Sequence, residues 1–377
     1  MLRFNQLMKY HGLIRHINTG ISDSFGRQHT YLRISLTEKC NLRCQYCMPC
    51  EGIKLTEKKH LLTLEERKVL IKLFYNTGFR KFRFTGGEPT ISNQLIKLIA
   101  YTNELHTNTT AAAAATTNNN NTNTTNTTNI TPTSIASPLT IGITTNGIML
   151  INNTNYIKDL VTAGLTSINI SLDTLSPTTY NTITRRNINN IIPKLLDLIY
   201  TCISYNIHVK INCVLLRSIN TNISDIISFI ELTRNINLDI RFIELMPFDG
   251  NQWNKEKFIS YNEVLHDLYS NGYNILPIPA PHVQPVPVPD SSSPISVPDS
   301  PLLVPVPDSP MNIREENTVE TYDNNILQHS SGRKYDKSDT TKWYHMPGYI
   351  GRVGFITTMT DHFCSKYICV HMCVYMA

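Results

Sequence analysis

The sequence predicts an α/β fold: a partial (β/α) barrel related to the TIM barrel, interrupted by two low-complexity insertions. Three observations carry this prediction. Short runs rich in Ile and Val alternate along the chain with longer runs of helical periodicity, as consecutive strand–helix units require. Without the insertions, the residues after position 22 come close to the ~250 residues of one barrel domain. Polar side chains follow several apolar runs, at the strand ends where barrels carry their functional groups.

Five runs are predicted strands. Their Ile and Val content is typical of parallel strands that are buried on both faces. The first run alternates polar and apolar residues and ends directly before a Gly-Gly pair. The five runs are Lys81–Thr85, Leu139–Thr144, Ser167–Leu172, His208–Leu215 and Asp239–Leu245.

Helices are predicted between these strands from capping signals and apolar periodicity. Thr63–Glu66 forms a capping box, and Gly78 is placed to end the helix that this box begins. Ser260–Glu263 opens another helix in the same way. The remaining predicted helices are Tyr156–Gly164, Ile191–Tyr205 and Ile223–Arg234.

Two segments are predicted insertions rather than parts of the core. Residues from about 107 to 137 are almost entirely Asn, Thr and Ala, too poor in large apolar side chains to build a core. Residues 277–341 are rich in Pro and repeat Val-Pro-Asp-Ser, which predicts an extended, solvated segment. A docking motif and a tolerated loop expansion are both open interpretations of it. We therefore expect a barrel over residues 23–276, the Pro-rich insertion, and a C-terminal region over 342–377.

Charge and composition bear on partners and location. The chain carries 34 Lys and Arg against 29 Asp and Glu, a net charge of +5, which is too mild to favour nucleic acid as a partner. No apolar run is long enough to span a membrane. Residues 1–22 contain basic but no acidic side chains, which favours a mitochondrial transit peptide and a matrix location; a basic tail on a cytoplasmic protein is the alternative. Nine cysteines without a recognisable secretory signal indicate a reducing compartment.

The most informative motif is a run of three cysteines, Cys40, Cys44 and Cys47, with the spacing C-x3-C-x2-C. A four-iron cluster used for electron transfer takes four protein thiolates, so three thiolates leave one iron open to another ligand. Two alternatives fit less well. A structural zinc site needs a fourth ligand, and Cys50, preceded by Met-Pro, is poorly spaced to supply it. A disulfide framework is typical of short secreted chains.

A second motif, Gly86–Pro89, follows the first predicted strand directly. Glycines at a strand end let the backbone approach a ligand closely, and Glu88 offers a carboxylate to an ammonium group. With the cysteine motif, this run resembles the radical S-adenosylmethionine (SAM) superfamily. The resemblance implies that the three cysteines hold a [4Fe-4S] cluster whose open iron chelates the amino and carboxylate groups of SAM. It also implies an electron donor that reduces the cluster, which then cleaves SAM to a 5′-deoxyadenosyl radical.

Polar residues at the remaining strand ends point to the same mouth of the barrel. The runs Thr144–Gly147 and Asn169–Asp173 turn polar where an apolar pattern would otherwise continue, and the run Ile243–Gly250, which includes Glu244, closes the series. Lys210 lies inside an apolar strand, and a lysine that faces a barrel interior is costly unless it meets an anion. These positions predict an anionic ligand inside the barrel.

Further runs resemble one family within that superfamily, the GTP 3′,8-cyclases of the molybdenum cofactor biosynthesis protein A type: Tyr31–Thr37, Asn169–Asp173 with Ile183–Arg186, and Gly354–Thr360. The resemblance implies SAM contacts at Tyr46, Gly87, Ser171 and Met246, and GTP contacts at Arg33, Arg83, Thr144 and Lys210. The implied reaction is the first step of molybdopterin biosynthesis. A hydrogen atom is abstracted from the ribose C3′ of GTP, and the carbon radical attacks C8 of guanine to give 3′,8-cyclo-7,8-dihydro-GTP. The implied pathway partner is cyclic pyranopterin monophosphate synthase.

The C-terminal region departs from this family's pattern. The family binds a second [4Fe-4S] cluster through C-x2-C and a third cysteine downstream. Cys364 matches the first of these ligands, but Tyr367 stands where the second thiolate belongs. Cys364, Cys369 and Cys373 could ligate a cluster by another spacing, but a truncated or misjoined reading frame accounts better for the change. The sequence thus predicts a degenerate or truncated second-cluster region. The alternatives are a different substrate and a catalytically impaired chain that still binds SAM.

Overall fold

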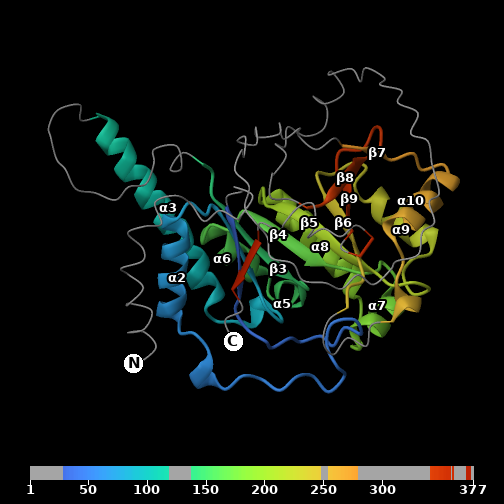
Figure 1. The fold of residues 1–377 in the computed structure, drawn as a ribbon, viewed down its shortest axis with the longest axis horizontal. Coiled ribbons are helices and arrows are strands. Elements are labelled where there is room, and N and C mark those ends of the chain that lie inside the picture. Colours follow the sequence, from blue (N-terminus) through green and yellow to red (C-terminus); the bar gives the residue numbers. More distant parts are fainter. Residues whose placement is uncertain are drawn as a thin grey trace, which may run out of the picture. The chain divides into compact units, whose positions relative to one another are not determined.

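The computed structural model describes residues 29–118, 137–247, 254–278, 340–357, 359–360 and 371–374. The predicted transit segment at 1–22 and most of both predicted insertions lie outside these residues. So does Cys364, the predicted ligand of a second cluster. Within the described part of the chain, a single sheet is accompanied by helices (Figure 1).

The sheet has ten strands in the order β10-β1-β2-β3-β4-β5-β6-β9-β8-β7. All neighbours from β10 to β9 are parallel, whereas β8 and β7 are antiparallel additions at one edge. The parallel-dominated sheet with helical crossovers confirms the predicted α/β class. The strands are β1 (Tyr31–Ser35), β2 (Lys81–Thr85), β3 (Thr140–Thr145), β4 (Ser167–Ser171), β5 (His208–Leu215), β6 (Asp239–Glu244), β7 (Leu276–Pro277), β8 (Lys342–His345), β9 (Arg352–Ile356) and β10 (His371–Val374).

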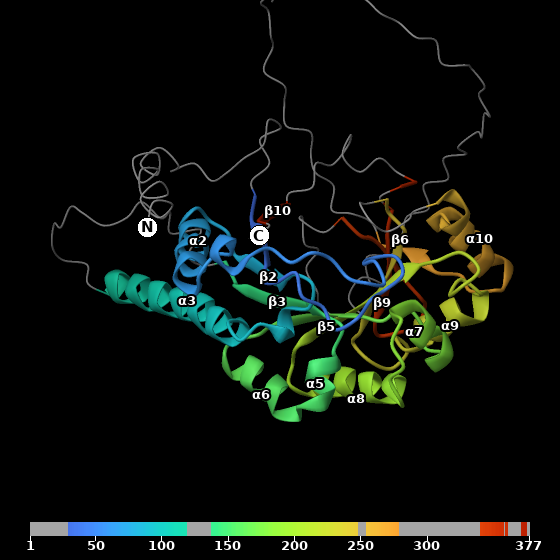
Figure 2. The same ribbon diagram turned by 90° about the horizontal axis from the view of Figure 1, so that it is seen from below.

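The helices connect successive strands, and α6, α5 and α8 lie along one side of the sheet in Figure 2. Both predicted capping boxes are present, at Thr63 before α2 and at Ser260 before α10. The α-helices are α2 (Leu64–Asn76), α3 (Leu95–Asn118), α5 (Ile148–Asn152), α6 (Thr154–Thr162), α7 (Pro177–Thr184), α8 (Ile191–Ser204), α9 (Ile223–Glu231) and α10 (Tyr261–Ser270); the 3-10 turns are η2 (Lys58–His60), η3 (Pro89–Ile91) and η4 (Lys255–Lys257).

The two faces of the parallel strands differ, contrary to the expectation of strands that are apolar on both. In β5, for example, buried Val209, Ile211 and Cys213 alternate with half-buried polar His208, Lys210 and Asn212. Because side chains alternate across a strand, the apolar set packs against the helices and the polar set shares the opposite face. We call this opposite face the inner face. The inner-face polar residues include Arg33, Arg83, Thr144, Ser167, Asn169, Ser171, His208, Lys210, Asn212, Asp239, Arg241 and Arg352.

Helix α3 is longer than its apolar pattern suggests. It continues to Asn118, so the first part of the Asn/Thr/Ala-rich tract is helical. The run of alanines within it explains this, since Ala has the highest helix propensity.

The strands that precede and follow the Pro-rich segment, β7 and β8, pair with each other. Strand β7 pairs antiparallel with β8, with Pro277 opposite Tyr344, and the Ile278 N–H donates to the Trp343 carbonyl at 2.8 Å. The residues on either side of the segment are therefore held side by side.

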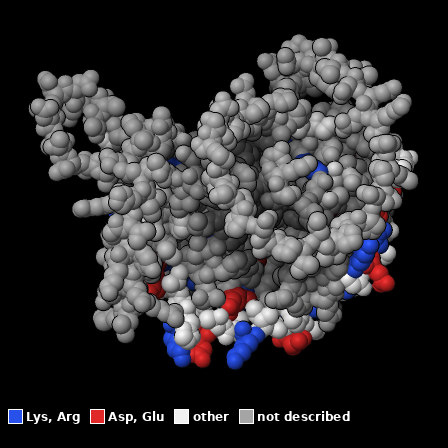
Figure 3. Space-filling view, viewed as in Figure 1, with Lys and Arg blue, Asp and Glu red and all other residues white. Residues whose placement is uncertain are grey.

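Two observations concern membrane spans and charge in the described residues. No helix in the described residues has both the length and the apolarity needed to cross a bilayer. On the face seen in Figure 3, described basic and acidic side chains are mixed along the lower edge.

Candidate active site

The cysteine motif forms a loop after the carboxyl end of β1. Cys40 and Cys44 are half-buried and pack against the core, Cys47 is exposed, and all three are free thiols. A turn closes the loop, since the N–H groups of Cys47 and Met48 both donate to the Cys44 carbonyl, at 2.9 and 3.0 Å. The Leu42 N–H points at the Cys40 Sγ atom at 3.5 Å. The loop thus presents three sulfur atoms at one end of the sheet.

The three thiols share one electrostatic environment. Burial raises the pKa of Cys40, Cys44 and Cys47, and the neighbouring thiols raise the pKa of Cys44 and Cys47 further. Metal coordination would reverse this, because a coordinated thiol is deprotonated. In the described residues no three His, Cys, Asp or Glu side chains gather around a single metal ion. A cluster has a different requirement, because each of its thiolates binds a separate iron. Three free cysteines on one loop supply the donor set that such a cluster needs.

The Gly-Gly pair packs against the cysteine loop itself. The Gly87 N–H donates to the Thr37 carbonyl at 2.5 Å, and the Glu88 N–H donates to the Lys39 carbonyl at 2.8 Å. A Cβ atom at Gly87 would overlap the carbonyl oxygens of Glu38 and Lys39. Because Gly87 has no side chain, the end of β2 packs directly against the backbone of the segment that leads into the cysteines.

Glu88 is used differently from the ammonium-binding role that its sequence suggested. Its carboxylate is 1% exposed and accepts four hydrogen bonds. Oε1 accepts from the Thr90 N–H (3.1 Å), the Thr90 hydroxyl (2.5 Å) and the Thr145 hydroxyl (2.7 Å), and Oε2 accepts from the Asn146 N–H (2.8 Å). Glu88 thus ties the end of β2 to the end of β3 beneath the cysteine loop.

Tyr46, a predicted SAM contact, is fixed by Asp173. The Tyr46 hydroxyl donates to Asp173 Oδ2 at 2.8 Å, and the Val214 N–H donates to Asp173 Oδ1 at 2.8 Å. Burial raises the pKa of Asp173 to about 6, against the lowering effect of these two hydrogen bonds. Asp173 was visible in the sequence only as the end of a polar run, and its partners come from a different strand and a different loop.

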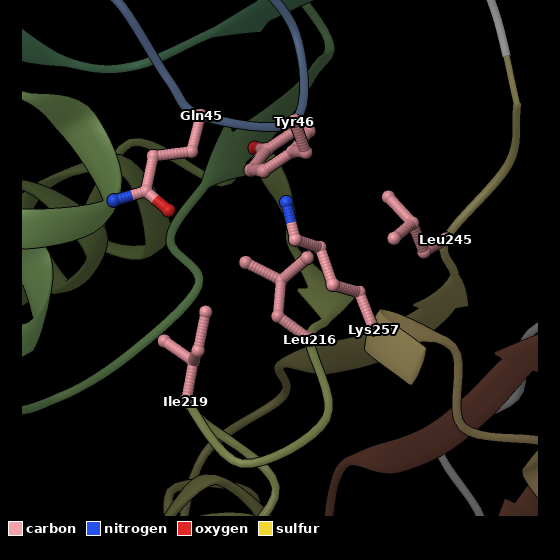
Figure 4. A pocket seen from close by; sticks show the side chains of 6 residues that line it. All are labelled: Gln45, Tyr46, Leu216, Ile219, Leu245 and Lys257. Atoms are coloured by element: carbon pink, nitrogen blue, oxygen red, sulfur yellow. The ribbon is translucent and has the colours of Figure 1, made fainter. Parts of the chain in front are cut away.

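A small pocket opens beside Tyr46 (Figure 4). Lys257 extends toward the Tyr46 ring within it. The pocket is lined by Gln45, Tyr46, Leu216, Ile219, Leu245 and Lys257. Met246 follows the lining residue Leu245 in sequence and is 39% exposed. Ser171 is the last residue of β4, at the same end of the sheet. The predicted SAM contacts therefore belong to the end of the sheet that carries the cysteines.

Arg33 and Arg83 lie side by side in register on β1 and β2. Arg83 is 4% exposed and donates to the Tyr31 hydroxyl (2.8 Å), the Ile143 carbonyl (2.8 Å) and the Ser167 hydroxyl (3.3 Å). Although burial alone would raise it, the pKa of Tyr31 falls to about 8 because Arg83, Arg33 and Lys81 surround the phenol. This end of the inner face is strongly electropositive.

Lys210 meets an anion from the protein itself. Its Nζ lies 3.3 Å from Asp239 Oδ2, which also accepts from His208 Nε2 and Arg352 Nη2, each at 2.9 Å. Burial would raise the pKa of Asp239, but His208, Lys210 and Arg352 together hold it well below its usual range. Thr144, the fourth predicted GTP contact, lies in the same cross-strand row two strands away. Sequence reasoning missed Asp239 and Arg352, which only strand register brings to Lys210.

The segment leading toward Cys364 is anchored at the same end of the sheet. Glu244, 1% exposed at the end of β6, accepts from the N–H groups of Met359 and Thr360 at 2.9 Å each and from the Thr360 hydroxyl. Its other donor is the Tyr261 N–H at 3.0 Å. Cys364 and Tyr367 themselves lie outside the described residues.

A comparison with protein families identifies the class of protein that carries this cysteine loop on a parallel α/β sheet. The Radical SAM superfamily matches residues 34–230, so the chain belongs to that superfamily. Solved structures with similar folds include Streptococcus suis SuiB bound to S-adenosylmethionine (TM-score 0.43, 14% identity, 71% of this chain and 57% of that one). Another is anSMEcpe with bound AdoMet (TM-score 0.46, 17% identity, 64% and 60%).

Within the superfamily the chain groups with the GTP 3′,8-cyclases, as its motifs predicted. It is 36% identical over 345 residues to Molybdenum cofactor biosynthesis protein 1 of Homo sapiens (91% of this chain, 40% of that protein). It is 34% identical to the mitochondrial GTP 3′,8-cyclase of Arabidopsis thaliana (91% and 64%) and 32% identical to the GTP 3′,8-cyclase of Alkaliphilus oremlandii (91% and 78%). The chain therefore spans about two fifths of the length of its human relative and most of the length of the Alkaliphilus protein.

Proposed function

We propose that this chain is a radical SAM GTP 3′,8-cyclase that converts GTP to 3′,8-cyclo-7,8-dihydro-GTP, the first step of molybdopterin biosynthesis. The observation that carries the proposal is a division of the site along the strands. Free cysteines stand at the carboxyl ends, and cations occupy the inner face below them.

The cysteine loop would hold the cluster and SAM. When bound and reduced, a [4Fe-4S] cluster at Cys40, Cys44 and Cys47 supplies the cleavage of SAM that yields the 5′-deoxyadenosyl radical. Tyr46 lines the pocket of Figure 4 and would contact SAM there, together with Met246, which follows the lining residue Leu245 in sequence. Gly87, after β2, and Ser171, at the end of β4, would supply the remaining contacts. Because Asp173 fixes the Tyr46 hydroxyl, the ring is oriented before any ligand arrives.

The inner face would bind GTP through Arg33, Arg83, Thr144 and Lys210. A triphosphate needs several cations when it is taken out of bulk water, and Arg and Lys are the side chains that supply them. The only carboxylate among the inner-face residues named above is Asp239, which faces His208, Lys210 and Arg352. Arg33 and Arg83, side by side on β1 and β2, would orient the phosphates so that the ribose C3′ faces the loop.

A second candidate is SAM cleavage without cyclisation. Tyr367 in place of a thiolate favours it, because a tyrosine cannot replace a cluster cysteine. In that case Cys364 would not complete a second [4Fe-4S] cluster, and GTP would lack the contact that the second cluster provides in the family.

The pathway setting follows the relatives. We propose that the product passes to cyclic pyranopterin monophosphate synthase, and that residues 1–22 direct the chain to mitochondria, where the name of the Arabidopsis relative places that protein. A fluorescent fusion with and without residues 1–22 would test the location; equal cytoplasmic signal for both would contradict it.

The test uses anaerobically reconstituted protein with SAM, GTP and a reductant. We expect cluster iron, 5′-deoxyadenosine and a cyclised nucleotide, the last detected by mass spectrometry. C47A should lower the cluster iron and abolish deoxyadenosine and the cyclised nucleotide, whereas C50A, which changes an exposed cysteine on the same loop, should retain all three. Deoxyadenosine without cyclised product would favour the second candidate. Neither cluster nor deoxyadenosine from the wild-type chain would refute both.

A further inference from the structure

The segment Thr182–Arg186 lies where helix α7 ends, in a run that the proposed chemistry leaves without a role. We propose that Arg185 and Arg186 are positioning residues that brace the cysteine loop and balance the negative charge of its cluster. This inference rests on the proposed cluster at Cys40, Cys44 and Cys47.

Main-chain contacts pin the middle of the loop to α7. The Arg43 N–H donates to the Thr184 carbonyl at 3.0 Å, and the Gln45 N–H donates to the Ile183 carbonyl at 2.9 Å. The Gln45 side chain adds a hydrogen bond to the Thr182 carbonyl at 2.9 Å. The last carbonyls of a helix lack partners within it, so the loop satisfies them. Both neighbours of Cys44 are fixed in this way.

The two arginines hold the rest of the loop. Arg185 Nη1 donates to the Met48 carbonyl at 3.0 Å and to the Arg43 carbonyl at 3.4 Å. Arg186 Nε donates to the Asn41 carbonyl at 3.1 Å. Asn41, Arg43 and Met48, which own these carbonyls, are the sequence neighbours of Cys40, Cys44 and Cys47, respectively. Together with the main-chain contacts, every cysteine has a neighbour that is held by Thr182–Arg186.

The backbone at Arg185 supports a dedicated role for its side chain. Arg185 ends α7 in the left-handed conformation, with φ 52° and ψ 38°. Glycine is the residue that usually occupies this position, because a side chain costs free energy there. The side chain of Arg185 is half-buried and donates hydrogen bonds to two loop carbonyls. These contacts explain why an arginine occupies this position despite the cost.

The charge of the pair also suits a cluster. Cysteine thiolates leave a [4Fe-4S] cluster with net negative charge, which grows on reduction. Local charge and hydrogen bonds set the reduction potential of such clusters. A guanidinium stays protonated at any working pH, and partial burial reduces its screening by salt. Two such groups beside the loop should favour the reduced cluster, opposing the nearby carboxylates of Glu88 and Asp173.

The experiment compares R185Q, R186Q, R185K and R186K with wild type and with R234Q. Arg234 is a matched control, since it forms an exposed ion pair with Glu231 on α9. Three quantities are measured: amide hydrogen exchange of residues 40–48 without cluster, iron bound after anaerobic reconstitution, and the cluster midpoint potential. The midpoint potential comes from titration followed by electron paramagnetic resonance.

We expect loop exchange to rise about tenfold in R185Q and R186Q, as loss of one or two hydrogen bonds would produce. Iron content should fall, and the clusters that form should have a lower potential than wild type. The lysine variants keep the positive charge and should restore the potential. R185K should not restore the slow exchange of the loop, because the lysine ammonium ends one bond short of the Arg185 Nη1 atom that donates to both loop carbonyls. The lysine variants also carry the test if a glutamine variant fails to fold.

Exchange and potential equal to wild type in R185Q and R186Q would overturn the inference. A wild-type chain that binds no cluster would instead refute the proposed function, while the exchange measurement on cluster-free protein would still decide whether the two arginines brace the loop.

Discussion

Asp239 sets the charge balance of the inner face. Asp239 is fully buried, and its carboxylate contacts His208 Nε2, Lys210 Nζ, and the Nε and Nη2 atoms of Arg352. A buried carboxylate is unfavourable alone, but several cations that face it would be equally unfavourable without it. The residue therefore has a structural function next to groups that are proposed to bind substrate.

We expect D239N to lower the free energy of unfolding by about 3–5 kcal/mol, the cost of leaving buried charges without their partner. Urea unfolding of the cluster-free protein measures this. D159N, which changes an exposed carboxylate on α6, should stay within about 0.5 kcal/mol of wild type. A D239N variant as stable as D159N would show that the cations find other partners.

The same residue predicts a pH dependence. The folded pKa of Asp239 is lowered, so its contribution to stability is complete above the unfolded value of about 3.9 and is lost as pH falls through the folded pKa. The part of the stability difference between wild type and D239N that comes from the Asp239 charge should therefore narrow as the pH falls below about 4. Unfolding curves of both proteins from neutral to acidic pH measure this; a gap that widened toward low pH would contradict it.

Among the elements, those with a clear periodic or capping signal were predictable. Strands β2 and β5 match their predicted bounds, and helices α2 and α10 begin at their predicted capping boxes. Helix α7 was not predicted because Pro177–Thr184 is mostly polar and lacks an apolar stripe. It is stabilised instead by a Ser176 cap and by its contacts with the cysteine loop.

Only the features of the site that depend on one residue type or on one motif spacing were predictable from the sequence. The cysteine spacing and the inward lysine were visible, but the partners of Glu88, Asp173 and Lys210 come from strands and loops distant in sequence. Register decides those pairs, and a shift by one residue would move every side chain to the other face. The predicted SAM and GTP contacts remain predictions until ligands are measured.

At the scale of elements, Glu244 joins β6 to the segment after β9. Met359 and Thr360 both donate their N–H groups to Oε2 of Glu244, so we expect E244A to lose both contacts, because alanine has no acceptor at that position. Amide exchange at residues 359–360 should rise about tenfold for each hydrogen bond lost, while β6 stays protected. E104A, at an exposed position on α3, is the control; unchanged exchange in E244A would mean that the segment is held by other contacts.

Strands β7 and β8, at one edge of the sheet, bring the two chain positions that flank the Pro-rich segment next to each other. Replacing residues 281–340 with a two-residue Asn-Gly turn, which keeps the register of β7 and β8, should leave the unfolding transition of the sheet within about 1 kcal/mol of wild type. Pro277 and Tyr344 already face each other, and shortening a loop changes closure entropy slowly. Circular dichroism and urea unfolding measure this. A large loss of stability would show that the Pro-rich segment packs on the sheet.

The alternation between the two faces of the sheet also bears on how this chain tolerates mutation. Side chains against the helices decide whether the protein folds, whereas inner-face side chains outside the Asp239 network decide what it binds. In a saturation mutagenesis experiment scored separately for abundance and for activity, the two sensitivities should therefore fall on different positions of β5. Val209, Ile211 and Cys213 would govern abundance, Asn212 would govern activity, and Lys210 would affect both because it pairs with Asp239. Substrate preference could then change among related proteins at inner-face positions that do not contact Asp239, with little effect on cellular protein levels.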